Sequence, residues 1–203
     1  MVAVAVEDAW METCLIAISI QGGSDIQFAS LTETVDFDIG EKDIEGVALT
    51  NGGRVTKWTA EGDSSITFEA YPLEAGTDSG TDGNGFFDLM HSADASVPLR
   101  ITNDRNRDKY RVLVMWTNDP TVSTGQAITT DTYSALRIGL ADGHFTSVKP
   151  SFTDGILKYT ITYKCAAFDR DGAGNVMMES CAGASGTDIL PAVASYTTSA
   201  KFD

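Results

Sequence analysis

The chain has 203 residues, a length that suits one domain with a substantial hydrophobic core. Its 14 Lys and Arg residues against 29 Asp and Glu residues give a formal net charge of −15. This is the wrong sign for a protein that binds nucleic acid or an anionic membrane tightly. Because screening in concentrated salt permits such dense like charge, the composition also indicates a halophilic source.

Two strands are predicted near the amino terminus, where apolar and polar residues alternate over 14–20 and again over 26–39. In the second strand Val35, Phe37 and Ile39 fall on one face, which we assign to the core. The opposite face of that strand is acidic and carries Thr34, Asp36 and Asp38.

A long charged span follows, and the chain returns from it into another alternating strand over 66–70. Asn-Gly-Gly at 51–53 supplies the turn. Residues 40–65 are therefore predicted to form a long protruding hairpin loop. Thr67 and Glu69 in the returning strand alternate with its apolar residues, and we place them on the same polar face.

Turn residues fill 76–85, and the segment FFDLMHS at 86–92 has the spacing of a short α-helix, the one helix that we predict. Residues 97–101 and 110–116 alternate on either side of the charged turn DRNRD, which predicts a β-hairpin. Asp-Gly at 142–143 predicts a turn after a strand that contains Leu136, Ile138 and Leu140.

A second Asp-Gly pair, at 154–155, predicts the turn before the run ILKYTITYKC, whose alternate residues share one face. Residues 181–203 are small and polar, and we interpret them as a C-terminal tail that is ordered only against another element. The whole chain, 1–203, is predicted to be a single domain of the mainly β class, a β-sandwich or barrel.

The cysteines Cys14, Cys165 and Cys181 are odd in number and widely spaced, which predicts reduced, mostly buried thiols. No stretch approaches the roughly 18 apolar residues of a membrane span, and no basic leader precedes the first strand. We therefore expect a soluble chain without a visible export signal and without membrane insertion.

No catalytic site is predicted. His91 and His144 accompany no catalytic motif, so each is interpreted as structural. Asp36 and Asp38 lie on one strand face without a row of aromatic residues, whereas a glycosidase needs two converging acids in a cleft. We expect no enzyme activity and no cofactor.

The string DRDGAGN at 169–175 is the best candidate for a metal site, because Asp169, Asp171 and Asn175 place oxygen ligands on a glycine-rich turn. Ser180 occupies the place of the bidentate glutamate of a calcium loop. A plain Asp-Gly turn is the preferred interpretation, and we expect no bound metal.

The order of these pieces resembles that of the major tail tube proteins of tailed viruses, whether of bacteriophages or of haloarchaeal viruses. That family is related in fold to the ring proteins of type VI secretion. The resemblance rests on the block from GSDIQF through the long hairpin to FEAYP, on FFDLMHS, and on the closing stretch VKPSFTDGILKYTITYKCAAFDRDGAGNVMMES. Together these parts span about residues 20–180.

The resemblance implies a β-sandwich that assembles as a hexameric ring, with strands of adjacent subunits joined into one lumenal barrel and rings stacked into a tube for genome delivery. Closing such a barrel removes exposed strand edges, and the long loop can reach the next ring. An acidic bore would repel DNA, so the expected lumen-lining residues are Thr34, Asp36, Asp38, Thr67 and Glu69.

Mixed charges suit complementary contacts between rings. The expected ring-stacking residues are Glu41, Lys42, Asp43, Glu45, Arg54, Lys57 and Trp58. The resemblance further implies that the partners are other copies of the chain and tail proteins at the tube ends, that viral DNA passes without specific binding, and that the protein resides in the virion after assembly in the host cytoplasm.

Two alternatives are kept. A secreted or cell-surface β-sandwich could bind calcium at 169–175 and a glycan at Trp58 or Trp116, although it would need an export signal that we do not find. An acidic hydrolase would need a convergent acid pair and a lined cleft.

Overall fold

The computed structural model describes residues 13–21, 26–70, 89–90, 105–117 and 134–182. Within these residues the chain forms nine strands and no α-helix. The strands are β1 (Thr13–Ile20), β2 (Ile26–Asp38), β3 (Ile44–Ala48), β4 (Arg54–Trp58), β5 (Ser64–Ala70), β6 (Tyr110–Thr117), β7 (Ser134–Thr153), β8 (Ile156–Cys165) and β9 (Val176–Ala182). The predicted mainly β fold is confirmed.

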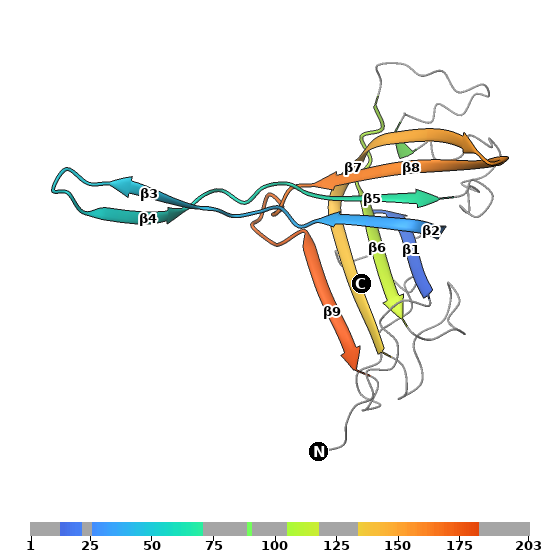
Figure 1. Cartoon of the computed structure of the whole chain (residues 1–203), viewed down its shortest axis with the longest axis horizontal. Helices are drawn as coiled ribbons and strands as arrows, with labels where there is room; N and C mark the ends of the chain where they lie inside the picture. The colour runs from blue at the N-terminus through green and yellow to red at the C-terminus, as the bar shows by residue number, and fades with distance from the viewer. Residues whose placement is uncertain (1–12, 22–25, 71–88, 91–104, 118–133, 183–203) are drawn as a thin grey trace.

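Seven strands form an antiparallel sheet in the order β6-β1-β2-β5-β8-β7-β9, and a further pairing between β6 and β7 closes it on itself. Figure 1 shows the strands in two crossing groups. We call β2 from Leu31 onward, β5, β8 and β7 from His144 onward the four-stranded sheet. The first halves of β2 and β7, with β1, β6 and β9, make the five-stranded sheet.

Strands β2 and β7 belong to both sheets, and each bends where it passes from one to the other. In β2 the pairing register shifts between Leu31 and Val35. In β7 Asp142 takes a φ of 60°, and β7 continues through Gly143 into its pairing with β8. The predicted turn at 142–143 was therefore wrong: this Asp-Gly pair bends a continuous strand, whereas the pair at 154–155 makes the predicted hairpin turn.

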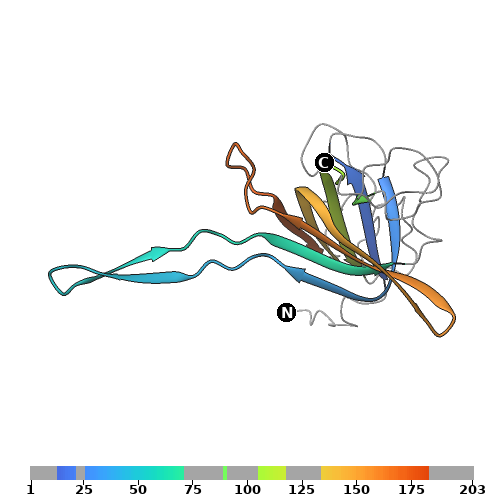
Figure 2. The ribbon, with the colours of Figure 1, turned by 90° about the horizontal axis from the view of Figure 1, so that it is seen from above.

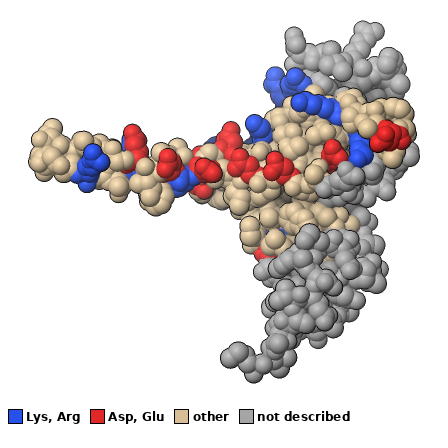
Figure 3. Space-filling model, viewed as in Figure 1, with Lys and Arg blue, Asp and Glu red and all other residues tan. Residues whose placement is uncertain are grey.

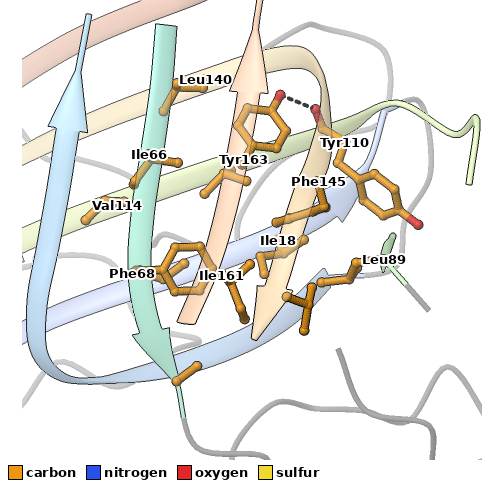
Figure 4. Close-up of a cluster of buried hydrophobic side chains, with 14 of the residues drawn as sticks. Ile18, Ile66, Phe68, Leu89, Tyr110, Val114, Leu140, Phe145, Ile161 and Tyr163 are labelled. Atoms are coloured by element: carbon orange, nitrogen blue, oxygen red, sulfur yellow. Dashed lines mark hydrogen bonds between the residues drawn. The ribbon is translucent and has the colours of Figure 1, made fainter. Parts of the chain in front are cut away.

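The hydrophobic core lies between the two sheets (Figure 4). Phe145 contacts both Tyr110 and Tyr163 edge-on, with ring centroids 5.2 and 5.3 Å apart. The buried Tyr163 hydroxyl donates to the Tyr110 carbonyl at 2.7 Å, which satisfies a polar group that would otherwise be costly to bury. Ile66, Phe68 and Ile161 fill the centre, each contributing about 1.5–3 kcal/mol through burial.

Both described cysteine side chains belong to this core and are free thiols, as predicted: Cys165 is buried, and Cys14 packs against the core from its margin. Burial raises the pKa of the Cys14 thiol to about 12, so the thiol stays protonated and unreactive at neutral pH.

The predicted hairpin between 97–101 and 110–116 was wrong. Strand β6 pairs with β1 along one edge and with β7 along the other, so both of its hydrogen-bonding edges are filled. Residues 97–101 themselves lie outside the described part of the chain. Sequence alternation identified β6 as a strand but carried no information about which distant strands flank it.

Most of the predicted helix at 86–92 also lies outside the described residues. Of its described pair, Leu89 is buried in a tight turn and Met90 packs against the core. The predicted tail begins too early, because Cys181 and Ala182 still pair with β7 as the end of β9. Residues 183–203 lie outside the described part.

Candidate assembly surfaces

The outer face of the four-stranded sheet brings the predicted lumen-lining residues together. Val35 and Phe37 turn toward the core, while Thr34, Asp36 and Asp38 are exposed. Cross-strand register extends this face over all four strands: Asp36 lies opposite Thr67, and Thr67 lies opposite Thr162. The Thr67 and Thr162 hydroxyl oxygens are 3.1 Å apart. Sequence alternation therefore separated these side chains from the core face, and their lumenal position stays a prediction.

The outer face is less acidic than expected, because strands β7 and β8 contribute basic residues to it. The carboxylates on the face are Asp36, Asp38 and Glu69, and the ammonium groups are Lys149, Lys158 and Lys164. Lys158 lies 3.8 Å from Glu69. The acids lie on the β2 and β5 half and the lysines on the β8 and β7 half, so the face is polar and divided by sign.

The two outer edges of the four-stranded sheet are open within the described part of the chain. Strand β2 pairs with β5 over 35–38, and no described strand pairs with its other side there. Strand β7 pairs with β8 over 144–153, again with no described strand on its opposite side. Pro150 lies in this stretch. Proline has no amide proton to donate to a neighbouring strand, and an open edge tolerates it because no neighbouring strand needs that hydrogen bond.

Residues 39–63, which we call the arm, form the predicted protruding hairpin. Figures 1 and 2 show it extending from the body as a two-stranded ribbon of β3 and β4. Every residue of both strands is exposed. The arm nevertheless carries large apolar side chains: Ile39, Ile44, Val47, Leu49, Val55 and Trp58. An isolated two-stranded ribbon of this kind is marginally stable in water.

Several predicted ring-stacking residues have partners within the arm. Lys57 and Glu45 form a cross-strand ion pair at 2.9 Å, and Lys42 lies 3.8 Å from Glu61. The Asp43 carbonyl accepts from the Thr59 amide at 2.8 Å. Figure 3 shows both signs of charge interspersed along the arm. These ion pairs are exposed and contribute little stability, and the apolar side chains of the arm remain exposed beside them.

Trp58 is the most exposed of these apolar residues, at 63%, and it lies opposite Ile44 in the β3–β4 ladder. Cross-strand partners share one face of a ribbon, so these two side chains form one apolar patch. Val47 and Val55 form a second pair on the other face, where Leu49 continues the alternation toward the tip.

The β7–β8 hairpin carries an exposed apolar group that sequence reasoning missed. Phe152 is 72% exposed, and Ile156 and Leu157 are exposed beside it, on either side of the turn at 154–155. We call these three residues the apolar tip. The sequence did contain a signal for this surface, because large apolar residues closely flank the Asp-Gly turn. Residues beside a solvent-exposed turn are normally polar, so apolar ones there indicate a contact surface.

The candidate metal residues Asp169 and Asn175 make hydrogen bonds within the turn at 166–175. The Asp169 carboxylate accepts hydrogen bonds from the amides of Asp171, at 2.9 Å, and Ala173, at 2.7 Å. Asn175 is buried and donates to the Ala166 carbonyl at 2.9 Å. In the described ranges, no three His, Cys, Asp or Glu side chains are grouped so that they could hold a metal ion. The preferred interpretation of this string as a plain turn accounts for its residues.

His144 also has a structural contact, since its Nδ1 lies 3.0 Å from the Asp108 carbonyl. His91 lies outside the described residues. Over the described ranges, no helix has the length and hydropathy needed to cross a membrane.

No protein-family model matches the chain, and no curated protein sequence matches it. Solved structures do match. The sheath/tube terminator of PVC, an extracellular contractile injection system, is 13% identical over 83% of this chain and 94% of that chain, with a TM-score of 0.47. The PVC sheath-tube complex matches at 16% identity over 83% and 89%, with a TM-score of 0.47. Hcp1 from Flavobacterium johnsoniae matches at 13% over 81% and 94%, with a TM-score of 0.36.

Proposed function

We propose that the protein is a structural subunit, without catalytic activity, that closes into hexameric rings and stacks them into the tail tube of a virus. The tube is the conduit through which the genome passes into the host cell. The partners are other copies of the chain and the tail proteins that bind the tube ends. The rings assemble in the host cytoplasm and reside in the virion.

The observation that carries this proposal is the pair of open edges on the four-stranded sheet. Because β2, β5, β8 and β7 alternate in direction, β2 and β7 run antiparallel to each other. Joining β7 of one copy to β2 of the next therefore continues the antiparallel pattern across the joint. A ring of such joints leaves neither edge of the four-stranded sheet unpaired, which removes the aggregation hazard of these two open strands.

Charge supports the same joint. The β2 edge carries Asp36 and the β7 edge carries Lys149, both exposed on the outer face. Placing β7 beside a neighbour's β2 brings opposite charges together, whereas β2 beside β2 or β7 beside β7 would bring like charges together. Such complementarity selects the head-to-tail arrangement that a ring requires.

In the assembled ring the outer face of the four-stranded sheet lines the lumen, with Thr34, Asp36, Asp38, Thr67 and Glu69 among its residues. The lysines of β7 and β8 join them there. A lining that is polar, divided by sign and without an unbroken basic stripe lets a polyanion slide past without specific binding. The arm extends from the body and makes the contacts between rings.

Reversing the charge of one edge residue tests the joint. Lys149→Glu is expected to weaken ring formation about tenfold or more, because it places a carboxylate beside the acidic β2 edge of the neighbour. Asp36→Lys is expected to do the same, and the two changes in one chain should restore rings. Size-exclusion chromatography with light scattering measures the ring fraction of each variant.

Asp36 is chosen over Asp38 because the Asp38 carboxylate accepts a hydrogen bond from the Gly40 amide and so has a local structural role. Lys164→Glu is the matched control, since Lys164 is exposed on the same face but lies on β8, inside the sheet. A double variant no better than either single one would count against the joint.

Ionic strength gives a second test. Each copy adds a formal charge of −15 to the assembly, and salt screens the resulting repulsion between copies. Tubes are therefore expected to grow longer and more numerous from dilute buffer to molar salt, as counted by negative-stain electron microscopy. Tubes equally abundant in both buffers would contradict the expected role of self-repulsion.

A further inference from the structure

The two strongest exposed apolar features of the described chain lie at opposite ends of the four-stranded sheet. The arm continues β2 and β5 beyond one end, and the β7–β8 turn with its apolar tip lies at the other end. Figures 1 and 2 show this separation from two directions. One copy cannot bring its own arm to its own tip, so any contact between them joins two copies.

We propose that the arm of one copy docks on the apolar tip of a copy in the adjacent ring, so that Phe152, Ile156 and Leu157 form the acceptor for the arm. This inference rests on the proposed function, since it names the partner surface of the ring-stacking arm. A contact between opposite ends of the same chain is heterologous, and its repetition along one direction extends a stack without limit.

The chemistry of the two surfaces matches. Phe152 is 72% exposed and Trp58 is 63% exposed, and both are large aromatic side chains of the kind that anchor protein interfaces. The distal part of the arm adds Val47, Leu49 and Val55. Trp58 lies on one face of the ribbon, and Val47, Leu49 and Val55 lie on the other, so the arm presents an apolar face to the tip whichever side it turns toward it. Burying that face against the tip removes from water apolar surface that each copy exposes alone.

The lengths also match. One limb of the arm, residues 39–50, would measure at most about 40 Å if it were extended throughout at about 3.3 Å per residue. The body measured along β8, Ile156–Cys165, is about 33 Å long on the same scale. When two copies are stacked end to end, the arm of one starts next to the apolar tip of the other. The arm is therefore long enough to reach that tip and to lie along the body of the second copy.

Backbone features make both surfaces well defined. At the tip, Asp154 and Gly155 have φ values of 55° and 78°, which is the two-residue turn that matches the twist of antiparallel strands. In the arm, the Leu49 amide donates to the Gly53 carbonyl at 2.8 Å and closes the β3–β4 turn. The turn of each hairpin is therefore fixed, so docking does not have to order either turn.

Phe152→Ser tests the acceptor. Phe152 lies on the β7 edge, but a serine there keeps the backbone groups that pair along that edge, so the change should leave the fold and the backbone pairing between copies in place. It should raise the protein concentration needed for tubes about tenfold or more, the usual loss for an aromatic anchor. Phe168→Ser is the matched control, since Phe168 is half-exposed on the 166–175 turn, away from the tip. Sedimentation of tubes over a concentration series, with ring content followed by light scattering, measures both quantities.

Cross-linking gives a direct measurement of the contact. Val55→Cys and Phe152→Cys in one chain, with Cys181→Ser, are treated with a short bismaleimide after tube assembly in molar salt. The protonated Cys14 thiol and buried Cys165 give little background. Covalent ladders of many chains are expected from tubes, and Phe168→Cys in place of Phe152→Cys should give none.

The outcomes separate this inference from the proposed function. Ladders together with a tube defect in Phe152→Ser support arm-to-tip docking. Intact tubes that yield no ladder, or that tolerate Phe152→Ser as well as Phe168→Ser, overturn the docking and leave the ring-and-tube function standing. Failure of the unmodified chain to form rings or tubes in any salt overturns both.

Discussion

Replacing residues 41–61 with an Asn-Gly dipeptide is expected to abolish tubes while leaving the body folded and able to form rings. The limbs of the arm already meet at its base. A methyl group on Gly40 would lie 2.6 Å from the Gly62 carbonyl oxygen, and the Ser64 hydroxyl donates to the Ile39 carbonyl at 2.7 Å. A two-residue turn can therefore close β2 onto β5 directly above this point.

The arm contributes no residue to the buried core, so its removal should change the midpoint of thermal unfolding little. Electron microscopy in molar salt then counts rings and tubes. Circular dichroism compares the thermal unfolding midpoints of the full-length and the shortened chain. A double change in the arm, Val47→Ser with Trp58→Ser, should reproduce the loss of tubes without shortening the chain. Tubes from the shortened chain at ordinary protein concentration would refute the stacking role of the arm.

Gly143→Ala is expected to lower the free energy of unfolding by about 3 kcal/mol, the upper part of the usual range for forcing a methyl group into a packed site. A Cβ at this position would lie 2.6 Å from both the Tyr163 Cζ and hydroxyl oxygen, and closer still to the Lys164 carbonyl oxygen. Relief would require the bend in β7 to shift or the Tyr163 hydroxyl to leave the Tyr110 carbonyl.

Gly46→Ala is the control for this change, because a methyl group there meets nothing within 4 Å. Its effect should stay within a few tenths of a kcal/mol, since strand glycines gain slightly from a side chain. Urea denaturation followed by tryptophan fluorescence measures both variants. Equal stability of the two would mean that β7 does not pass close to Tyr163.

The sequence allowed the strands with a regular two-residue alternation to be predicted, because burial on one face leaves that period directly in the residues. It also separated the core face of β2 from its exposed face at Val35, Asp36 and Phe37. The pairing partners of each strand were harder to predict. The alternation in β6 cannot say that β1 and β7 flank it, since those contacts join residues far apart in the chain.

Asp-Gly pairs show the limit of local signals. The pair at 154–155 makes a hairpin turn, whereas the pair at 142–143 bends a strand. Both aspartates have positive φ values, 55° and 60°, but only Gly155 follows with a positive φ, 78°, whereas Gly143 does not. The dipeptide is the same in both places, so the different backbone reflects tertiary surroundings: Gly143 packs against Tyr163 and Lys164 of β8, and no short stretch of sequence reports that neighbour.

The candidate surfaces also differ in how far local sequence could predict them. The polar residues of β2 and β5 were identifiable because they alternate with core residues. The lysines of β8 and β7 joined them only through the register that sets Lys164 opposite Ser65, and Lys149 opposite Thr160. The apolar tip was missed because a pattern of apolar residues near a turn is ordinarily assigned to the core.

The sharing of β2 and β7 between the two sheets has a consequence for how the molecule opens. Neither sheet can lose its hydrogen bonds without releasing a strand that the other sheet needs, so amide protons in both should exchange with solvent through one common opening event. The amides of β3 and β4 depend on neither sheet, and they should exchange by local fraying long before the body does. The protein thus combines one cooperative unit with an appendage whose opening is independent of that unit.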